Sequence, residues 1–262
     1  MPDKKKVASL LNTEIFGREL FFFERIDSTN KFLKQCASKS SNGAVAMADE
    51  QLEGQGRQGK KWHSSSCTAV LMSLLIKPVD IVRAPALTLL CGLAVAKTLN
   101  SLCGGGFAIK WPNDIVSDGK KVAGILCEAK LARGCAYAVC GIGINLMQES
   151  SFFEDNSLNF GTSVKMLKGS APTVEQAAAG VINTFETIYK EYLAGREKNI
   201  LEEYSSICIT LGSKVCVQYK DKVIIGTATK ISPSGSLSID TGSENIAVNA
   251  GEVSVRGIMG YV

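Results

Sequence analysis

The chain has 262 residues, 45% hydrophobic and 21% charged, as expected of one large folded domain or of a domain with a small module. Its net charge of +4 suits an anionic ligand but is too small to indicate a nucleic-acid-binding protein. Nine cysteines stand singly, without a CxxC pair, and His63 is the sole histidine. This pattern argues for reduced thiols and against a disulfide framework, a zinc site or a Ser-His-Asp triad.

The N-terminal residues lack the apolar run of a secretory signal, and the longest apolar stretch, 84–102, is interrupted by Lys97 and Asn100. We therefore expect a cytoplasmic protein without a membrane span. In chain order, strands are predicted at 20–24, 44–48, 69–76, 107–110, 122–129 and 137–145. The capping residues of 27–30 begin one predicted helix, and further helices are predicted at 85–102, from Thr173 along a single apolar stripe, and at 198–204.

After about residue 211 the pattern changes to short strands, at 215–219, 223–225, 237–240 and 245–248, separated by turn residues. A small β-barrel docked on the larger domain is the expected result. Because strands and helices mix without regular βαβ alternation, the larger domain is predicted to be α+β with a mixed or antiparallel sheet.

The segment from Gly54 to Trp62 joins three glycines, three cations and an indole. Glycines allow the backbone N–H groups to approach an anion, Arg57 offers a planar fork for phosphate or carboxylate, and Trp62 offers a flat face for a ring. The segment is neither a Walker loop nor a dinucleotide fingerprint. A mobile surface loop is the alternative interpretation of this segment alone.

Three further motifs carry polar groups at the ends of predicted strands. In Lys110-Trp-Pro-Asn-Asp114, the carboxylate of Asp114 could accept a proton or help to hold Mg²⁺, although a simple turn gives the same pattern. Lys121 precedes Gly124 in a strand where the glycine would clear space. In Gly141-Ile-Gly-Ile-Asn145, alternate glycines leave one sheet face bare for a ring whose edge Asn145 could contact; a bulge is the alternative.

Taken in order, Ser28-Thr-Asn30, the Gly54–Trp62 segment, Lys110–Asp114, Lys121-x-x-Gly-Ile125 and Gly141-x-Gly-x-Asn145 resemble the motifs of biotin protein ligases, and the resemblance runs from about Phe23 to the C-terminus. It implies a catalytic domain like that of class II aminoacyl-tRNA synthetases at 1–208 and an SH3-like β domain at 209–262. The stretch before Phe23 is too short for a winged helix, so the monofunctional type without DNA binding is expected.

The resemblance implies that biotin and ATP are substrates, with Mg²⁺ mainly on the ATP phosphates and no certain metal ligand in the protein. Biotinyl-5′-AMP would form first, and its biotinyl group would then pass to a lysine on the biotin carrier domain of a carboxylase. The protein would act as a monomer or a homodimer. A lipoate–protein ligase of the same fold and a non-enzymatic binding module are the alternatives.

The residue roles implied by the resemblance form three overlapping sets. The catalytic residues would be Arg57, Lys121 and Asp114. The biotin-binding residues would be Ser28, Thr29, Asn30, Gln51, Gly54, Gln55, Gly56, Arg57, Lys121 and Gly124. The ATP-binding residues would be Arg57, Lys60, Trp62, Asn113, Lys121, Gly141 and Asn145.

Two positions depart from the family pattern, because Gln55 and Lys60 stand where arginine is usual. Gln55 removes a charge from the loop but can still donate a hydrogen bond. We therefore expect weaker retention of the intermediate, with activity preserved. The cations of residues 50–62 repel one another, so this segment is expected to be mobile without ligand and ordered with it.

Overall fold

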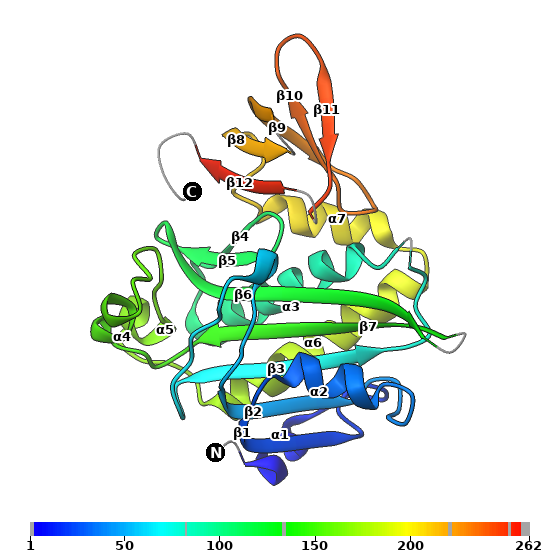
Figure 1. Ribbon diagram of the computed structural model, residues 1–262, viewed down its shortest axis with the longest axis vertical. Helices are drawn as coiled ribbons and strands as arrows, with labels where there is room; N and C mark the ends of the chain where they lie inside the picture. Colours follow the sequence, from blue (N-terminus) through cyan, green and yellow to red (C-terminus); the bar gives the residue numbers. More distant parts are fainter. Residues whose placement is uncertain (1–2, 82, 133–134, 220–221, 251–252, 258–262) are drawn as a thin grey trace.

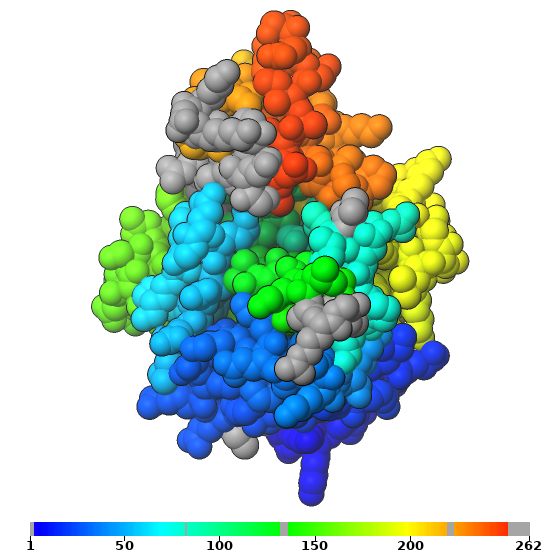
Figure 2. All heavy atoms as spheres, turned by 45° about the vertical axis from the view of Figure 1, so that its right-hand side comes forward, coloured from blue at the N-terminus to red at the C-terminus, as the bar shows by residue number. Residues whose placement is uncertain are grey.

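The structure is a computed structural model that describes residues 3–81, 83–132, 135–219, 222–250 and 253–257. Its larger part is built on a seven-stranded sheet, and its C-terminal part is a smaller five-stranded sheet that stands at one end of it (Figure 1). Figure 2 shows the C-terminal sheet, in orange and red, rising from the larger body.

The seven-stranded sheet is mixed, as the sequence predicted. Only β1 and β2 pair in parallel, and every other neighbouring pair is antiparallel. The strands follow in the spatial order β1 (Leu20–Ile26), β2 (Val45–Gln51), β3 (Ala69–Ile76), β7 (Cys135–Asn145), β6 (Lys120–Ala132), β5 (Asp114–Ser117) and β4 (Ala108–Lys110).

Helices cover both faces of this sheet (Figure 1). The first face carries α3 (Ala86–Cys103) and α6 (Val174–Leu193), and the second carries α2 (Thr29–Cys36). The remaining helices are α1 (Lys4–Leu10), which packs on α6, the 3₁₀ turn η1 (Arg57–Gly59), α4 (Ser150–Asp155), α5 (Val164–Lys168) and α7 (Glu197–Ser206).

The central strand β3 is buried along its whole length, which explains its nearly continuous apolar sequence. Helix α6 begins with a capping box: the Thr173 hydroxyl accepts from the backbone of Gln176, and the Gln176 side chain accepts from the backbone of Thr173. Helix α2 begins at the predicted place, with Ser28 as its N-cap. These local signals and the apolar stripe place both helices on the sheet.

Among the described residues, α3 is the one helix long and apolar enough to cross a membrane. It lies inside the protein, because 67% of it is buried and it packs against α6 and the sheet. The expected buried helix is therefore present, and its hydrophobicity reflects packing on two sides.

The C-terminal sheet is antiparallel, in the order β11 (Asn245–Val248), β10 (Leu237–Asp240), β9 (Lys222–Ile231), β8 (Lys214–Tyr219) and β12 (Val253–Gly257). Its size and pairing agree with the expected SH3-like module. Trp111, only 1% exposed, joins it to the larger part by donating its indole N–H to the Gly235 carbonyl at 3.1 Å. The backbone of Ile109, on β4, pairs with that of Cys208, in the segment between α7 and β8.

Glu186, on α6, holds the segment that leads into β1. Its carboxylate accepts hydrogen bonds from the backbone N–H groups of Glu14 at 2.6 Å, Ile15 at 2.9 Å and Phe16 at 2.8 Å, and it pairs with Lys190 at 3.0 Å. Burial acts to raise the pKa of Glu186, but the backbone hydrogen bonds outweigh it and the pKa lies below its ordinary value.

Glu186→Gln is expected to lower the free energy of unfolding by about 2–4 kcal/mol, because charge-assisted bonds to buried N–H groups are lost. The wild-type contribution of Glu186 is present above its unfolded pKa, about 4.3, and is lost as pH falls through the lower folded pKa. Urea unfolding at neutral and acidic pH measures both effects. The control is Glu202→Gln, which removes a charge from an exposed pair with Lys198 and should change the free energy of unfolding by less than about 0.5 kcal/mol. Equal losses of stability in the two variants would contradict the structural role of Glu186.

Candidate active site

A cleft of about 960 Å³ opens on the face of the large sheet that carries α2. Its walls are the start of α2, the segment between β2 and β3, the β4–β5 turn, and the loop that follows α4. Every residue predicted for the site lines this cleft except Gly54. Motifs that lie far apart along the chain therefore meet in one place.

The segment between β2 and β3 is a narrow hairpin. Trp62 donates its backbone N–H to the Gly54 carbonyl at 2.8 Å, and Gly56 donates to Lys60 at 2.6 Å. A side chain at Gly54 would lie 2.8 Å from the Trp62 carbonyl, so this glycine is needed to close the hairpin. Gly54 thus has a structural position beside the cleft.

Two cations from different elements lie at the Asn113-Asp114 pair. Lys121, on β6, forms an ion pair with Asp114 on β5, with 2.5 Å between Nζ and Oδ1. The Arg57 guanidinium lies on the hairpin and donates to the Asn113 side-chain oxygen at 2.9 Å. Lys121 and Asp114 are 29% and 14% exposed, so their charges act with little screening by water.

Arg57 also donates to the carbonyl oxygen of Ala250, so the C-terminal sheet region contacts the hairpin directly. Burial lowers the pKa of the Arg57 guanidinium, and the negative charge of Asp114 acts in the opposite direction. A guanidinium starts from so high a pKa that it keeps its charge at neutral pH. The resulting Arg57–Asp114–Lys121 group is a positive centre with one carboxylate inside it.

The indole of Trp62 lies against glycines of the sheet. Gly124 and Gly143 pair across β6 and β7, and a side chain at Gly143 would lie 2.5 Å from the indole. Lys121 approaches the same ring, with Nζ 5.6 Å from its centroid. The bare sheet face predicted from the alternate glycines is therefore present, and part of it supports an aromatic ring of the protein itself.

Gly143→Ala is expected to displace the Trp62 indole, because 2.5 Å is far below van der Waals contact. We expect a red shift and increased acrylamide quenching of tryptophan fluorescence as the ring becomes more exposed. The matched control is Gly92→Ala in helix α3, where the new methyl group would have its nearest neighbour, an atom of Tyr204, at 3.9 Å. An unchanged spectrum in Gly143→Ala would contradict the packing described.

At the α2 end of the cleft, short polar side chains form a connected network. Gln51 accepts from the Thr29 backbone at 2.8 Å and from its hydroxyl at 3.1 Å, and that hydroxyl contacts Ser73 at 2.7 Å. Asn30 accepts from Ser73 at 2.6 Å and donates to Glu128 at 2.9 Å. Because each group fixes the next, the Gln51 amide has one defined orientation in the cleft.

Two predicted nucleotide contacts are already engaged with protein atoms. Asn145 donates to the Thr162 carbonyl at 3.2 Å and accepts from Gln148 at 3.0 Å. A side chain at Gly141 would lie 2.4 Å from Asn30, so Asn30 packs on this glycine. Asn145 lines the cleft with its amide held, and Gly141 provides room for the polar network.

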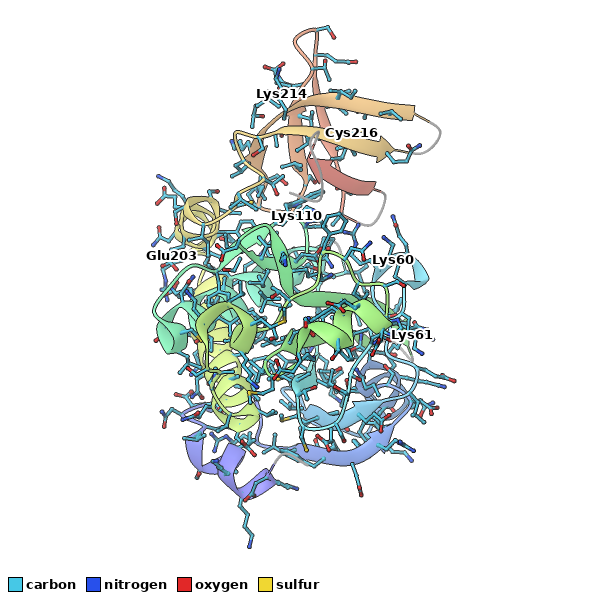
Figure 3. All side chains as sticks on the ribbon, turned by 90° about the vertical axis from the view of Figure 1, so that its left-hand side faces the viewer. Lys60, Lys61, Lys110, Glu203, Lys214 and Cys216 are labelled. Atoms are coloured by element: carbon cyan, nitrogen blue, oxygen red, sulfur yellow. The ribbon has the colours of Figure 1, made fainter. Side chains whose placement is uncertain are left out.

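The lysines of the site differ in burial. Lys60 and Lys61 are exposed on the hairpin, and Gln55 is exposed opposite Lys61. Lys110 is only 7% exposed and lies at the junction between the two sheets, whereas Lys60 and Lys61 lie on the outer side of the protein (Figure 3). Lys60 therefore lines the cleft from its exposed side.

Sequence reasoning missed several residues of the site. Ser73 and Glu128 belong to the polar network, Gly143 seats Trp62, and residues 157–161 line the end of the cleft near Lys121. A serine or glutamate inside an otherwise apolar strand was the available signal for Ser73 and Glu128. The loop at 157–161 has no such signal; the Lys121 backbone, which donates to the Phe160 carbonyl at 2.6 Å, holds it in place.

Residues 22–145, which hold all five motifs, match the model of the Biotin/lipoate A/B protein ligase family. The matched segment contains most of the residues that line the cleft, and it defines the class of protein.

Individual relatives narrow the class. The chain is 31% identical over 234 residues to the bifunctional ligase/repressor BirA of Bacillus spizizenii, covering 88% of this chain and 72% of the relative. It is 28% identical to the biotin–[acetyl-CoA-carboxylase] ligase of Mycobacterium tuberculosis, with 90% and 88% covered. The biotin protein ligase of Aquifex aeolicus, solved with biotin and ATP, superimposes with a TM-score of 0.78 at 26% identity, covering 92% of this chain and 99% of that one.

The chain therefore belongs to the biotin protein ligase family and is a ligase enzyme.

Proposed function

We propose that this ligase activates biotin with ATP and attaches it to a carrier protein. In the first step, a carboxylate oxygen of biotin attacks the α-phosphorus of ATP, giving biotinyl-5′-AMP and pyrophosphate. In the second, the amine of a carrier lysine attacks the acyl carbon, giving an amide, AMP and a proton. The observation that carries the proposal is the convergence of Arg57, Lys121 and Asp114 in one cleft.

The first step must bring two anions together, and their repulsion is its main electrostatic cost. Lys121 pairs with Asp114, and Arg57 bonds to the neighbouring Asn113, so the two cations offer a preformed positive centre at which a carboxylate and a phosphate can meet. Asp114 then has to release Lys121 partly to the incoming anions. This exchange supports roles for Arg57 and Lys121 in the activation of biotin.

The head of biotin is a cyclic urea with two N–H donors and one carbonyl acceptor. The polar network at the start of α2 supports binding of this head, because Thr29 fixes the orientation of the Gln51 amide and Ser28 stands beside it. A site built for fixed donors and acceptors rejects molecules that leave those groups unpaired. We assign the α2 end of the cleft to biotin.

For the nucleotide, we assign the region around Trp62, whose indole lines the cleft beside Lys121. An aromatic face suits an adenine ring, and Asn145 stands nearby as a polar group of the wall. Lys60, exposed at the rim, would contact the phosphates from the open side.

The acidic side chains that line the cleft already carry cationic partners. Asp114 pairs with Lys121, Glu128 with Lys34 at 2.8 Å, and Glu53 with Lys31 at 3.3 Å. These three described carboxylates do not form a cluster that could hold Mg²⁺ by itself. The side chains present therefore fit a Mg²⁺ ion that enters bound to the phosphates of ATP. Bound in this way, the ion neutralises phosphate charge and leaves activation of the carboxylate to Arg57 and Lys121.

The second step needs a neutral amine beside the acyl carbon. Asp114 lies at the start of β5, where its carboxylate can orient a lysine amine and accept its proton. We further propose that the acceptor lysine lies on the biotin carrier domain of a carboxylase. The protein would act in the cytoplasm, as a monomer or a homodimer, without binding DNA.

The direct test is to mix the protein with Mg-ATP, a biotin carrier domain and either biotin or lipoate, and to weigh the carrier by mass spectrometry. We expect the mass of one biotinyl group, dependent on ATP, and no lipoyl adduct. A lipoyl adduct would assign the protein to the lipoate-ligating branch of its class. A carrier without modification in either reaction would contradict the proposed acceptor.

A further inference from the structure

Three cysteines converge on the face of the large sheet opposite to the cleft. Cys91 lies on α3, Cys127 on β6 and Cys140 on β7, and their Sγ atoms all lie within 4.8 Å of one another. Thirty-six residues separate Cys91 from Cys127 and thirteen separate Cys127 from Cys140, so their spacing gives no short metal-binding motif. The fold alone brings them together.

The register of the sheet fixes two of the three thiols. Cys127 and Cys140 are directly opposite each other in the antiparallel pair β6–β7, so their side chains share a face. That face is the one covered by α3, which supplies Cys91. The three Sγ atoms therefore lie within 4.8 Å of one another at the interface between α3 and the sheet.

The three thiols differ in burial. Cys91 and Cys140 are fully buried among apolar residues, whereas Cys127 and the neighbouring Thr88 are half-buried. Cys127 is therefore the member of the cluster most accessible to solvent. Among the residues that the structure describes, this is the one group of cysteine, histidine and acidic side chains arranged to hold a metal ion.

We propose that Cys91, Cys127 and Cys140 form a trigonal thiolate site for a soft, thiophilic cation such as Cu⁺ or Cd²⁺. Thiolates select soft cations over Mg²⁺ or Ca²⁺. Metal–sulfur bonds of about 2.3 Å, the length of zinc–thiolate bonds, would place three sulfur atoms about 4 Å apart in a plane, and the Sγ atoms here lie within 4.8 Å of one another. Three S–H bonds break, three metal–sulfur bonds form, and the three protons pass to solvent without any change of oxidation state.

The proposal is tested by titrating the full-length reduced protein with Cd²⁺ and following the ultraviolet thiolate-to-cadmium charge-transfer band. We expect the band to saturate at one equivalent and the unfolding temperature to rise, because the ion binds the folded state. Cys140→Ala should weaken Cd²⁺ binding at least about tenfold, since even the loss of a group supporting a metal ligand has that effect. Cys36→Ser and Cys103→Ser, which lie outside the cluster, are the controls.

A second variant distinguishes the loss of Cd²⁺ binding from misfolding of the protein. Cys127→Ser changes the half-buried member of the cluster. We expect it to keep the wild-type circular dichroism spectrum and to bind Cd²⁺ as weakly as Cys140→Ala. A wild-type protein without saturation at one equivalent would overturn the proposal. So would a band that persists at full strength in Cys127→Ser or Cys140→Ala, because the ion would then be bound by other cysteines.

Discussion

Lys121→Ala is expected to lower the rate of biotin adenylation by about 10²- to 10³-fold, the usual cost of removing one preorganised group that stabilises a developing charge. Nζ of Lys121 lies 2.5 Å from Asp114 and faces the Trp62 ring, so it is held at the proposed meeting point of carboxylate and phosphate. Biotin-dependent release of pyrophosphate measures the effect.

The matched control for this variant is Lys120→Ala. Lys120 is the preceding residue of β6 and is exposed to solvent, and it does not line the cleft. Its replacement should leave the adenylation rate within about twofold of wild type, as expected of a surface substitution. Thermal unfolding of both variants verifies that they fold. Near-normal pyrophosphate release by a folded Lys121→Ala protein would remove Lys121 from the chemistry.

Asp114→Asn is expected to slow transfer of the biotinyl group to the carrier by about 10²- to 10⁴-fold, the usual contribution of a general base. The amide keeps the shape of the carboxylate but cannot take a proton from the incoming amine. The measurement is a single-turnover transfer from preformed biotinyl-5′-AMP to a carrier domain. Pyrophosphate release in the first step should fall by less, because Lys121 and Arg57 remain.

The control is Asp118→Asn, in the exposed turn after β5, where the charge is removed at a distance from the cleft. Equal losses in the adenylation and transfer steps of Asp114→Asn would assign the carboxylate to holding Lys121 and not to the amine. Transfer at the wild-type rate would contradict any role in the second step.

The parts of the fold that could be predicted are those with strong local signals. The strand at 69–76 and the C-terminal strands at 237–240 and 245–248 occur at the predicted residues, and α6 begins after the predicted Thr173 cap. Their apolar patterns and caps act within a few residues, so tertiary contacts do not override them.

The missed elements are short or depend on distant partners. The polar pair Asn113-Asp114 was predicted to lie at the end of a strand, with a simple turn as the alternative. Asp114 in fact begins the four-residue strand β5, because β4 and β6 pair with it on either side. The helices α1, α4 and α5 and the strand β12 have at most seven residues and were not predicted. In such elements, packing against the rest of the chain decides the structure.

The same distinction applies to the site. The motifs identified residues that line the cleft, since glycines, cations and an indole in one segment have few structural uses. They could not reveal that Trp62 lies on Gly143 or that Arg57 bonds to Ala250, nearly two hundred residues later. Contacts of this kind depend on the register of β6 with β7 and on docking of the C-terminal sheet, which local sequence does not encode.

Arg57 and Lys121 are proposed to bring a carboxylate and a phosphate together. A crystal structure of the protein with biotinyl-5′-AMP is the decisive test. We expect Nζ of Lys121 and the Arg57 guanidinium to lie within hydrogen-bond distance, about 3 Å, of the oxygens at the acyl-phosphate junction. Both side chains turned away from that junction, with the intermediate bound in the cleft, would contradict it.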